Sequence, residues 1–316
     1  MLDILHYDLL DFVTSYGVRI PSLRVTYQLF GKPLGTAPVV VVNHAFTGNS
    51  QVAGENGWWA EAIGAAKVID TDIYTVVAFN IPGNGFHARE EDMITNYQHW
   101  AAVDVARLFN IALKEHLGLN SVFALVGCSL GGGIAWEMAA LAPDYFQQLV
   151  IVAADWKATD WIIGNCLLQE QILKNSTHPL HDARLHAMLC YRTPQSLKMK
   201  FERTTHLPTQ LYNVESWLLH HGEKLNKRFS LSAYKLMNQL VKTIDISKDR
   251  GSFAEAVAPI TAHITIVSTD SDLYFVPQEN REMGKPVDYY EIHSIHGHDA
   301  FLIEHKQLEQ FLKKIF

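Results

Sequence analysis

Residues 126–133 have the sequence Val126-Gly127-Cys128-Ser129-Leu130-Gly131-Gly132-Gly133, which contains the pattern Gly-x-Ser-x-Gly. An apolar run precedes it (Val122 to Val126), and apolar residues at helical spacing follow it (Ile134, Met138, Leu141). A strand, a sharp turn and a helix in this order form a nucleophile elbow, which holds a serine hydroxyl above the edge of a sheet. Gly127 and Gly131 would let the backbone turn through angles that penalise a residue with a Cβ atom. We therefore predict that Ser129 is a nucleophile, although the pattern alone also fits an ordinary glycine-rich turn.

The composition indicates a globular α/β protein and argues against several classes of partner. With 316 residues, 48% of them hydrophobic, the chain can bury a large core. Its net charge of −7 and its scattered lysines and arginines disfavour nucleic acid or an anionic membrane as the main partner. The first residues lack the pattern of a signal peptide, and no apolar segment is typical of a membrane span. Cys128, Cys166 and Cys190 form an odd, irregular set that suits free thiols in a reducing compartment, so we predict a cytoplasmic protein.

Strands and helices alternate along most of the chain. Alternating residues and turn residues in the first forty positions predict antiparallel edge strands. Continuous apolar runs predict buried strands at 39–42, 74–79 and 149–154, and strand character returns at 263–268 and 287–292. Helical spacing over 102–117 predicts a helix that Gly118 ends, and a last helix is expected from Ala300 to Phe316. This pattern predicts an α/β fold with a mostly parallel sheet and helices on both faces. Together with the nucleophile elbow it indicates the α/β-hydrolase class.

One part of the chain interrupts this alternation. Residues 156–250 contain no convincing buried strand, and long, mixed, helix-forming residues dominate there. We interpret this part as a helical lid insertion, with 1–155 and 251–316 forming the core domain.

Two further residues complete a catalytic set with the serine. A serine hydroxyl needs a base, and the base needs an orienting partner. Asp272 follows the predicted strand at 263–268, and His298 follows the one at 287–292, which is the order Ser, Asp, His of α/β hydrolases. Asp270 and His296 are the alternatives for the acid and the base.

The same pattern predicts an oxyanion hole made of backbone amides. The amide of Leu130, directly after the serine, is one expected donor, and that of Phe46, after the strand at 39–42, is the other. No metal is predicted, because neither histidine group, 178/181/186 or 293/296/298, has a recognised metal spacing with carboxylates.

Several longer strings resemble one family in particular. The chain is similar to the homoserine O-acyltransferases of the MetX type, which are α/β-hydrolase-fold enzymes of methionine biosynthesis. The matching stretches are His44-Ala45-Phe46-Thr47-Gly48, Gly57-Trp58-Trp59, Ile69-Asp70-Thr71-Asp72-Ile73-Tyr74, the elbow, Val214-Glu215-Ser216-Trp217-Leu218, Gly222-Glu223-Lys224, Arg228-Phe229, Ser271-Asp272-Leu273-Tyr274-Phe275 and His296-Gly297-His298-Asp299-Ala300-Phe301-Leu302.

The resemblance implies a ping-pong acyltransferase with no bound cofactor. Ser129, deprotonated by His298, would take an acyl group from an acyl-CoA, expected to be acetyl-CoA, and pass it to the hydroxyl of L-homoserine. The family places an arginine and, seven residues later, a tyrosine on a lid helix near the amino-acid substrate, and Arg184 and Tyr191 stand at that spacing. Arg184 would bind the α-carboxylate, and Asp299 would pair with the α-ammonium group. A homodimer through the lid is also implied.

The chain departs from the family at residues 81–88, Ile81-Pro82-Gly83-Asn84-Gly85-Phe86-His87-Ala88, where a different glycine-rich stretch is usual. This change concerns the region of the acyl pocket, so acetyl or succinyl as the acyl group, and homoserine or a related hydroxy amino acid as the acceptor, stay open. A hydrolase with the same three residues is the alternative activity.

Overall fold

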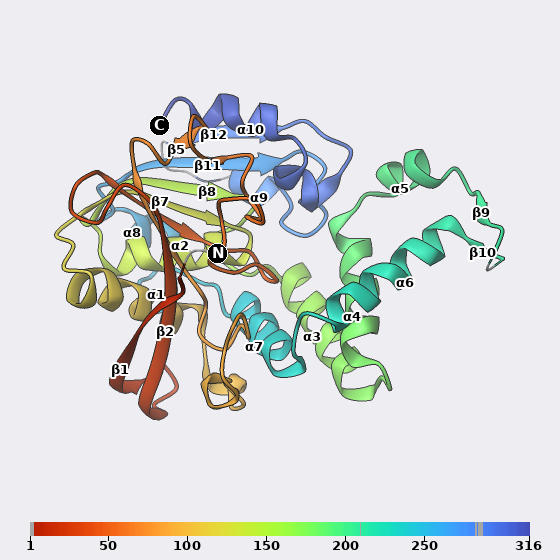
Figure 1. The fold of residues 1–316 in the computed structure, drawn as a ribbon, viewed down its shortest axis with the longest axis horizontal. Coiled ribbons are helices and arrows are strands. Elements are labelled where there is room, and N and C mark those ends of the chain that lie inside the picture. The colour runs from red at the N-terminus through yellow and green to blue at the C-terminus, as the bar shows by residue number, and fades with distance from the viewer. Residues whose placement is uncertain (1–2, 209, 282, 284–286) are drawn as a thin grey trace.

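The computed structural model describes residues 3–208, 210–281, 283 and 287–316, and its centre is an eight-stranded sheet in the order β1-β2-β6-β3-β7-β8-β11-β12 (Figure 1). β1 and β2 are antiparallel, β2 is antiparallel to β6, and every later pair in the order is parallel. This arrangement confirms the predicted fold class. The strands are β1 (Leu5–Val13), β2 (Arg19–Gly31), β3 (Val39–Asn43), β6 (Thr75–Phe79), β7 (Val122–Cys128), β8 (Phe146–Val152), β11 (His263–Thr269) and β12 (Asp288–Ile292), with a separate pair of β4 (Ile63–Gly64) and β5 (Ile69–Asp70).

Strand β3 shows why a continuous valine run forms a central strand. Val39 and Val41 belong to one apolar cluster and Val40 and Val42 to the other, because successive side chains of a strand point to opposite faces. The first cluster contains residues of α1 (Ala102–Ile111) and α2 (Leu130–Leu141), and the second contains residues of α10 (His305–Leu312). The sheet is therefore buried on both faces, as the run predicts.

Two predicted helices differ in detail from the structure. The helix expected over 102–117 is α1 followed by a π-helical turn, η3 (Ala112–His116), and Gly118 ends it with φ +64°. The single helix expected from Ala300 to Phe316 is wrong: a 3₁₀ helix, η4 (Gly297–Leu302), is followed by α10. The break occurs because Glu304, with ψ 52°, leaves the helical region and becomes the N-terminal cap of α10.

The segment between β8 and β11 is mainly helical, and its middle part projects away from the sheet (Figure 1). Thr159, Thr193 and Ser230 start three of these helices by accepting a hydrogen bond from an amide three residues later. The boundaries 156–250 for a separate insertion stay a prediction. The elements are α3 (Asp160–Asn175), α4 (Pro179–Tyr191), α5 (Pro194–Phe201), β9 (Thr205–His206), β10 (Leu211–Tyr212), α6 (Asn213–Asn226) and α7 (Leu231–Lys242).

The remaining short elements are η1 (Glu90–Asp92), η2 (Tyr97–His99), α8 (Phe253–Val257) and α9 (Gln278–Arg281). Within the described ranges, no helix combines the length and the apolar character needed to cross a membrane.

Candidate active site

The turn between β7 and α2 has the geometry of a nucleophile elbow. Ser129 adopts φ 53° and ψ −124°, a conformation that is costly for a residue with a side chain and is concentrated at functional sites. The expected reason for the two flanking glycines is wrong, because the positive φ belongs to the serine. Gly127 and Gly131 instead allow close approach: an added Cβ atom would lie 2.2 Å from the carbonyl oxygen of Gly131 at the first and 2.4 Å from that of Asn43 at the second.

A chain of hydrogen bonds connects the serine with a histidine and a carboxylate. Nε2 of His298 lies 2.9 Å from Oγ of Ser129, and Nδ1 of His298 lies 2.7 Å from Oδ2 of Asp272. The other oxygen of Asp272 accepts hydrogen bonds from the amides of Tyr274 (2.7 Å) and Phe275 (3.0 Å). Because a carboxylate only accepts, the Nδ1 of His298 donates, and Nε2 is left to accept the proton of Ser129.

Burial and charge act in opposite directions on this histidine. Burial lowers the pKa of His298, but the negative charge of Asp272, its hydrogen bond and the charge of Asp299 together outweigh that effect and raise the pKa. The imidazolium form is thus favoured by its surroundings once the ring has taken a proton. Ser129 is only 3% exposed and His298 only 4%, so the arrangement can extract a proton from a serine in a nearly dry site.

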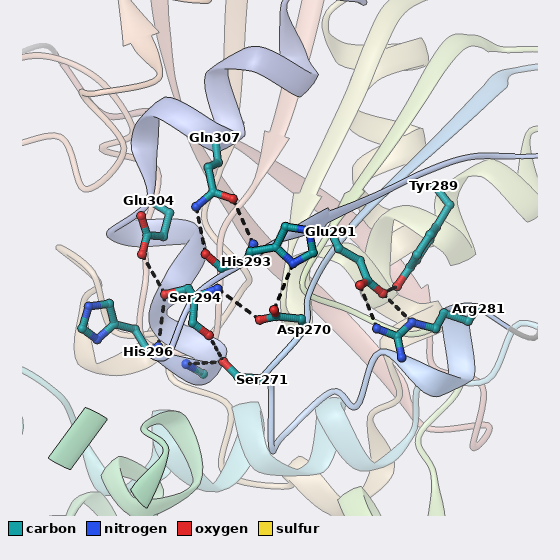
Figure 2. Close-up of polar contacts among 11 residues, drawn as sticks. Asp270, Ser271, Arg281, Tyr289, Glu291, His293, Ser294, His296, Glu304 and Gln307 are labelled. Atoms are coloured by element: carbon teal, nitrogen blue, oxygen red, sulfur yellow. Dashed lines mark hydrogen bonds and ion pairs between the residues drawn. The ribbon is translucent and has the colours of Figure 1, made fainter. Parts of the chain in front are cut away.

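The two alternative residues lie in a neighbouring hydrogen-bond network (Figure 2). The carboxylate of Asp270 contacts Nδ1 of His293 (3.0 Å) and accepts from the amide of Ser294 (3.1 Å). Nδ1 of His296 lies 2.9 Å from Oγ of Ser196. The structure therefore joins Asp272 and His298, not Asp270 and His296, to the serine.

Ser271 fixes the two loops that carry the acid and the histidine relative to each other. Its hydroxyl donates to the carbonyl of Ser294 and accepts from the amide of Gly297 at 3.1 Å (Figure 2). Gly297 has φ +66°, and an added Cβ atom there would lie 2.9 Å from the carbonyl oxygen of Tyr191. Only glycine combines this backbone angle with this contact.

The loop after β3 brings the second predicted oxyanion donor to the site. In the described part of the chain, neither the amide of Phe46 nor that of Leu130 donates to a protein acceptor, so both can serve an oxyanion. Buried His44 holds this loop: its Nδ1 donates to the carbonyl of Ala45 (2.7 Å) and its Nε2 accepts from the amide of Ile81 (3.1 Å). Burial lowers the pKa of His44 to about 4, so the ring is neutral.

The stretch that departs from the family therefore supports the oxyanion loop. Nδ2 of Asn84 lies 3.3 Å from Nε2 of His44 and donates to Oδ1 of Asn80 at 3.2 Å. That same oxygen of Asn80 accepts from the amide of Ser50. An added Cβ atom on Gly83 would lie 2.7 Å from Cδ2 of Leu236 in α7, so the stretch packs directly beneath the helical segment.

The predicted substrate residues of α4 lie beside the histidine. The ring of Tyr191 is 5.3 Å from that of His298, and the guanidinium carbon of Arg184 is 5.6 Å from the ring of Tyr191. Asp299, in contrast, already has a cationic partner, because its Oδ2 accepts from Nε of Arg192 at 2.8 Å. Its pairing with a substrate ammonium group would have to compete with, or be shared with, Arg192.

Two residues near the site have contacts that the sequence did not reveal. Arg228 donates to the carbonyl oxygen of Thr47 (3.0 Å) and to its Oγ1 (3.3 Å), so it fastens the end of α6 to the oxyanion loop. Arg228-Phe229 was among the strings that carry the family resemblance, which was the only signal. Asp155 follows β8, and burial, then the charges of Asp272 and Glu279, raise its pKa well above the ordinary value. Its Oδ1 accepts a hydrogen bond from Nδ2 of Asn280 at 3.0 Å.

Comparison with known proteins identifies the fold and the family. The family described as alpha/beta hydrolase fold matches residues 38–305. Homoserine O-acetyltransferase of Cyclobacterium marinum is 30% identical over 324 residues, which cover 95% of this chain and 91% of that protein. The structure of homoserine O-acetyltransferase from Bacillus anthracis superposes with a TM-score of 0.88 at 19% identity, covering 100% of this chain and 97% of that one. Esterase E22 has the same fold, with a TM-score of 0.85 at 17% identity and 100% coverage of both chains.

Proposed function

Because the chain belongs to the α/β-hydrolase fold family and, within it, to the homoserine O-acetyltransferase family, we propose that it transfers an acetyl group from acetyl-CoA to the hydroxyl of L-homoserine, a step of methionine biosynthesis. The observation that carries the proposal is Arg184, a cation without a carboxylate partner within the described residues, which lies over Tyr191 beside His298. A hydrolase of simple esters needs no such cation, whereas an amino-acid acceptor brings an α-carboxylate that a guanidinium group binds with two hydrogen bonds.

In the first half-reaction, His298 takes the proton of Ser129 as its oxygen attacks the thioester carbonyl. The negative charge that develops on the carbonyl oxygen is stabilised by the amides of Leu130 and Phe46. When the tetrahedral intermediate collapses, the carbon–sulfur bond breaks, His298 returns the proton to the leaving thiolate, and the acetyl group stays on Ser129. Asp272 holds the tautomer of the imidazole throughout.

In the second half-reaction, homoserine binds with its carboxylate at Arg184. Its hydroxyl gives a proton to His298 and attacks the acetyl-enzyme, and the acetyl ester of homoserine leaves while Ser129 recovers its proton. Burial of Ser129 and His298 supports transfer over hydrolysis, because water must lose to a bound alcohol at the acetyl-enzyme. We propose that the enzyme holds no resident cofactor and that the acyl-CoA acts as a co-substrate.

The test measures release of CoA from acetyl-CoA with and without homoserine. The proposal expects release that depends on homoserine. Release at the same rate without homoserine would show a thioester hydrolase, which is the alternative. Mass spectrometry of the intact protein after a short exposure to acetyl-CoA or succinyl-CoA identifies the acyl group by its increment on Ser129.

We also propose that the chain forms a homodimer through its helical segment and works in the cytoplasm. Large apolar side chains are exposed on this segment, which supports an interface there: Trp161, Leu167, Leu168, Leu189, Met199, Leu207 and Leu219. The three free cysteines agree with a reducing compartment. Sedimentation of the purified protein tests the dimer, and a monomer at every concentration would refute it.

A further inference from the structure

Four cations lie on the helical segment next to the site and outside the hydrogen-bond chain of Ser129, and together they form what we call the cationic strip: Arg184, Lys200, Lys224 and Arg228. They belong to α4, α5, α6 and the turn after α6. Among the described residues, none of the four forms an ion pair with a carboxylate. Such an uncompensated concentration of charge is unexpected in a chain whose net charge is −7.

The inner end of the strip touches the candidate active site. Arg228 donates to Thr47 in the oxyanion loop, and Arg184 lies over the ring of Tyr191, which packs beside His298. Arg184 is also close enough to Arg228 to lower its pKa, after partial desolvation. A negatively charged group that entered here would meet both guanidinium groups within reach of Ser129.

The strip extends outward to Lys200 in α5, a helix that contacts the projecting helix α6 (Figure 1). The ring of His221 packs 4.4 Å from that of Trp217, and Nζ of Lys200 lies 5.1 Å from the same tryptophan ring. Burial first, and then Arg184, His220, Lys224 and Lys200, lower the pKa of His221 to about 4. Cations from three helices therefore act on one imidazole. From Trp217 to Asn226, the last residue of α6, the helix axis rises about 14 Å at 1.5 Å per residue.

Like charges held this close destabilise the folded chain unless a ligand neutralises them, and they raise the local concentration of anions. The proposed acyl donor is such an anion: its thioester end is neutral, and its phosphates lie at the other end of a long flexible arm. We propose that Lys200 and Lys224, the outer members of the cationic strip, bind the phosphate groups of the acyl-CoA, so that the thioester lies at Ser129 and the nucleotide end lies outward beside α5 and α6. This inference rests on the proposed function and adds the site that selects CoA.

The two halves of the strip have different tasks in this proposal. Arg184 and Arg228 are the inner pair, near enough to Ser129 to act on the acceptor or on the oxyanion loop. Lys200 and Lys224 are the outer pair, both exposed and on different helices, and nothing in the acceptor chemistry requires them. Their removal therefore tests donor binding without touching the residues proposed for the chemistry.

The experiment compares the double variant K200Q/K224Q with the wild type on two donors, acetyl-CoA and S-acetylpantetheine, which carries the same thioester but no phosphate. We expect the KM for acetyl-CoA to rise about tenfold, which corresponds to about 1.4 kcal/mol for two exposed ion pairs. The KM for S-acetylpantetheine and the kcat with either donor should stay unchanged. The KM of the wild type for acetyl-CoA should also rise with salt more steeply than that of the variant.

A matched control removes the same charge elsewhere. Lys32 and Lys306 are exposed and belong to the sheet domain, so K32Q/K306Q should leave both KM values unchanged. An equal rise in KM for both donors, or the same rise in the control, would overturn the proposal, and so would a variant with an unchanged KM for acetyl-CoA.

Binding of CoA measured by calorimetry keeps this result separate from the proposed function. If the wild type turns over acetyl-CoA but K200Q/K224Q binds CoA as tightly as the wild type, the strip is refuted and the transferase stands. If the wild type forms no acetyl-enzyme, but K200Q/K224Q binds CoA about tenfold more weakly than the wild type, the proposed acetyl transfer is refuted and the proposed CoA site stands.

Discussion

Replacing Asp272 by asparagine changes one atom of the proposed catalytic set and leaves its shape. Oδ1 of an asparagine can still accept from the amides of Tyr274 and Phe275, which lie 2.7 and 3.0 Å from this oxygen in the wild type. The atom facing Nδ1 of His298, now 2.7 Å away, becomes an NH₂ group that can only donate. Nδ1 must then accept, so the proton of the neutral ring moves to Nε2. That nitrogen faces Oγ of Ser129 at 2.9 Å and can no longer act as the base.

The expected loss in kcat/KM is large because it comes from the wrong tautomer. In a serine protease the same exchange of aspartate for asparagine lowers kcat about 10⁴-fold with the geometry intact. At about 1.36 kcal/mol per factor of ten, this equals about 5.4 kcal/mol of transition-state stabilisation. We expect a loss of this order for Asp272→Asn, together with a much slower formation of the acetyl-enzyme.

The assay follows CoA release with a thiol reagent and acetyl-enzyme formation by mass spectrometry, and thermal unfolding verifies that the variant is folded. The matched control is Asp270→Asn, which removes a carboxylate two residues away that contacts His293 and Ser294 instead. The control should keep kcat/KM within about threefold. If Asp272→Asn lost less than tenfold, or if Asp270→Asn lost as much as Asp272→Asn, the assignment of Asp272 as the orienting acid would be refuted.

Three further changes probe other parts of the site. The pKa of His298 is raised above its ordinary value of 6.5, and the base must be neutral to act, so kcat/KM of the wild type should fall with decreasing pH through a midpoint above 6.5; a midpoint below 6 in a pH profile would contradict this. Gly131→Ala places a Cβ atom 2.4 Å from a backbone oxygen of β3 and should lower the free energy of unfolding, measured in urea, by about 3 kcal/mol. The control is Gly164→Ala in α3, where the added Cβ atom meets nothing within 4 Å. This control should raise the free energy of unfolding by up to about 1 kcal/mol. Arg228→Lys cannot make both hydrogen bonds to Thr47 and should lower kcat about tenfold without changing the thermal midpoint; an unchanged kcat would exclude a positioning role.

The sequence predicts the sheet and the three central residues of the site because their signals are local. The run Val39–Val42 marks a strand that is buried on both faces, and the carboxyl ends of parallel strands meet at one edge. Ser129, Asp272 and His298 each follow a parallel strand of this sheet, so their order along the chain is enough to bring them to that edge. The choice of Asp272 over Asp270 was harder, since both lie in the same loop and only the contacts of each carboxylate distinguish them.

The remaining features depend on contacts that no local pattern encodes. Arg192 reaches Asp299 across 107 positions, and Arg228 reaches Thr47 across 181. The first contact occupies a carboxylate that was expected to be free for substrate, and the second reveals a link between α6 and the oxyanion loop. Gly127 and Gly131 are a further example. Their presence in the sequence predicts the turn, but glycine is required there because backbone atoms lie close to both positions, across the turn for Gly127 and from a distant strand for Gly131.

The oxyanion loop is held from two sides, and the second side has a functional consequence. On the core side, buried and neutral His44 connects the loop to the amide of Ile81, and burial makes this contact independent of pH above about 4. On the side of the helical segment, Arg228 donates to Thr47 from the turn after α6, and the ring of Phe46 packs 4.8 Å from that of Tyr234 in α7. The second side is the one that faces the proposed donor site. Because Arg228 belongs to the cationic strip, an acyl-CoA bound there would lie next to the residue that holds Thr47, and donor binding would be coupled to the position of the Phe46 amide.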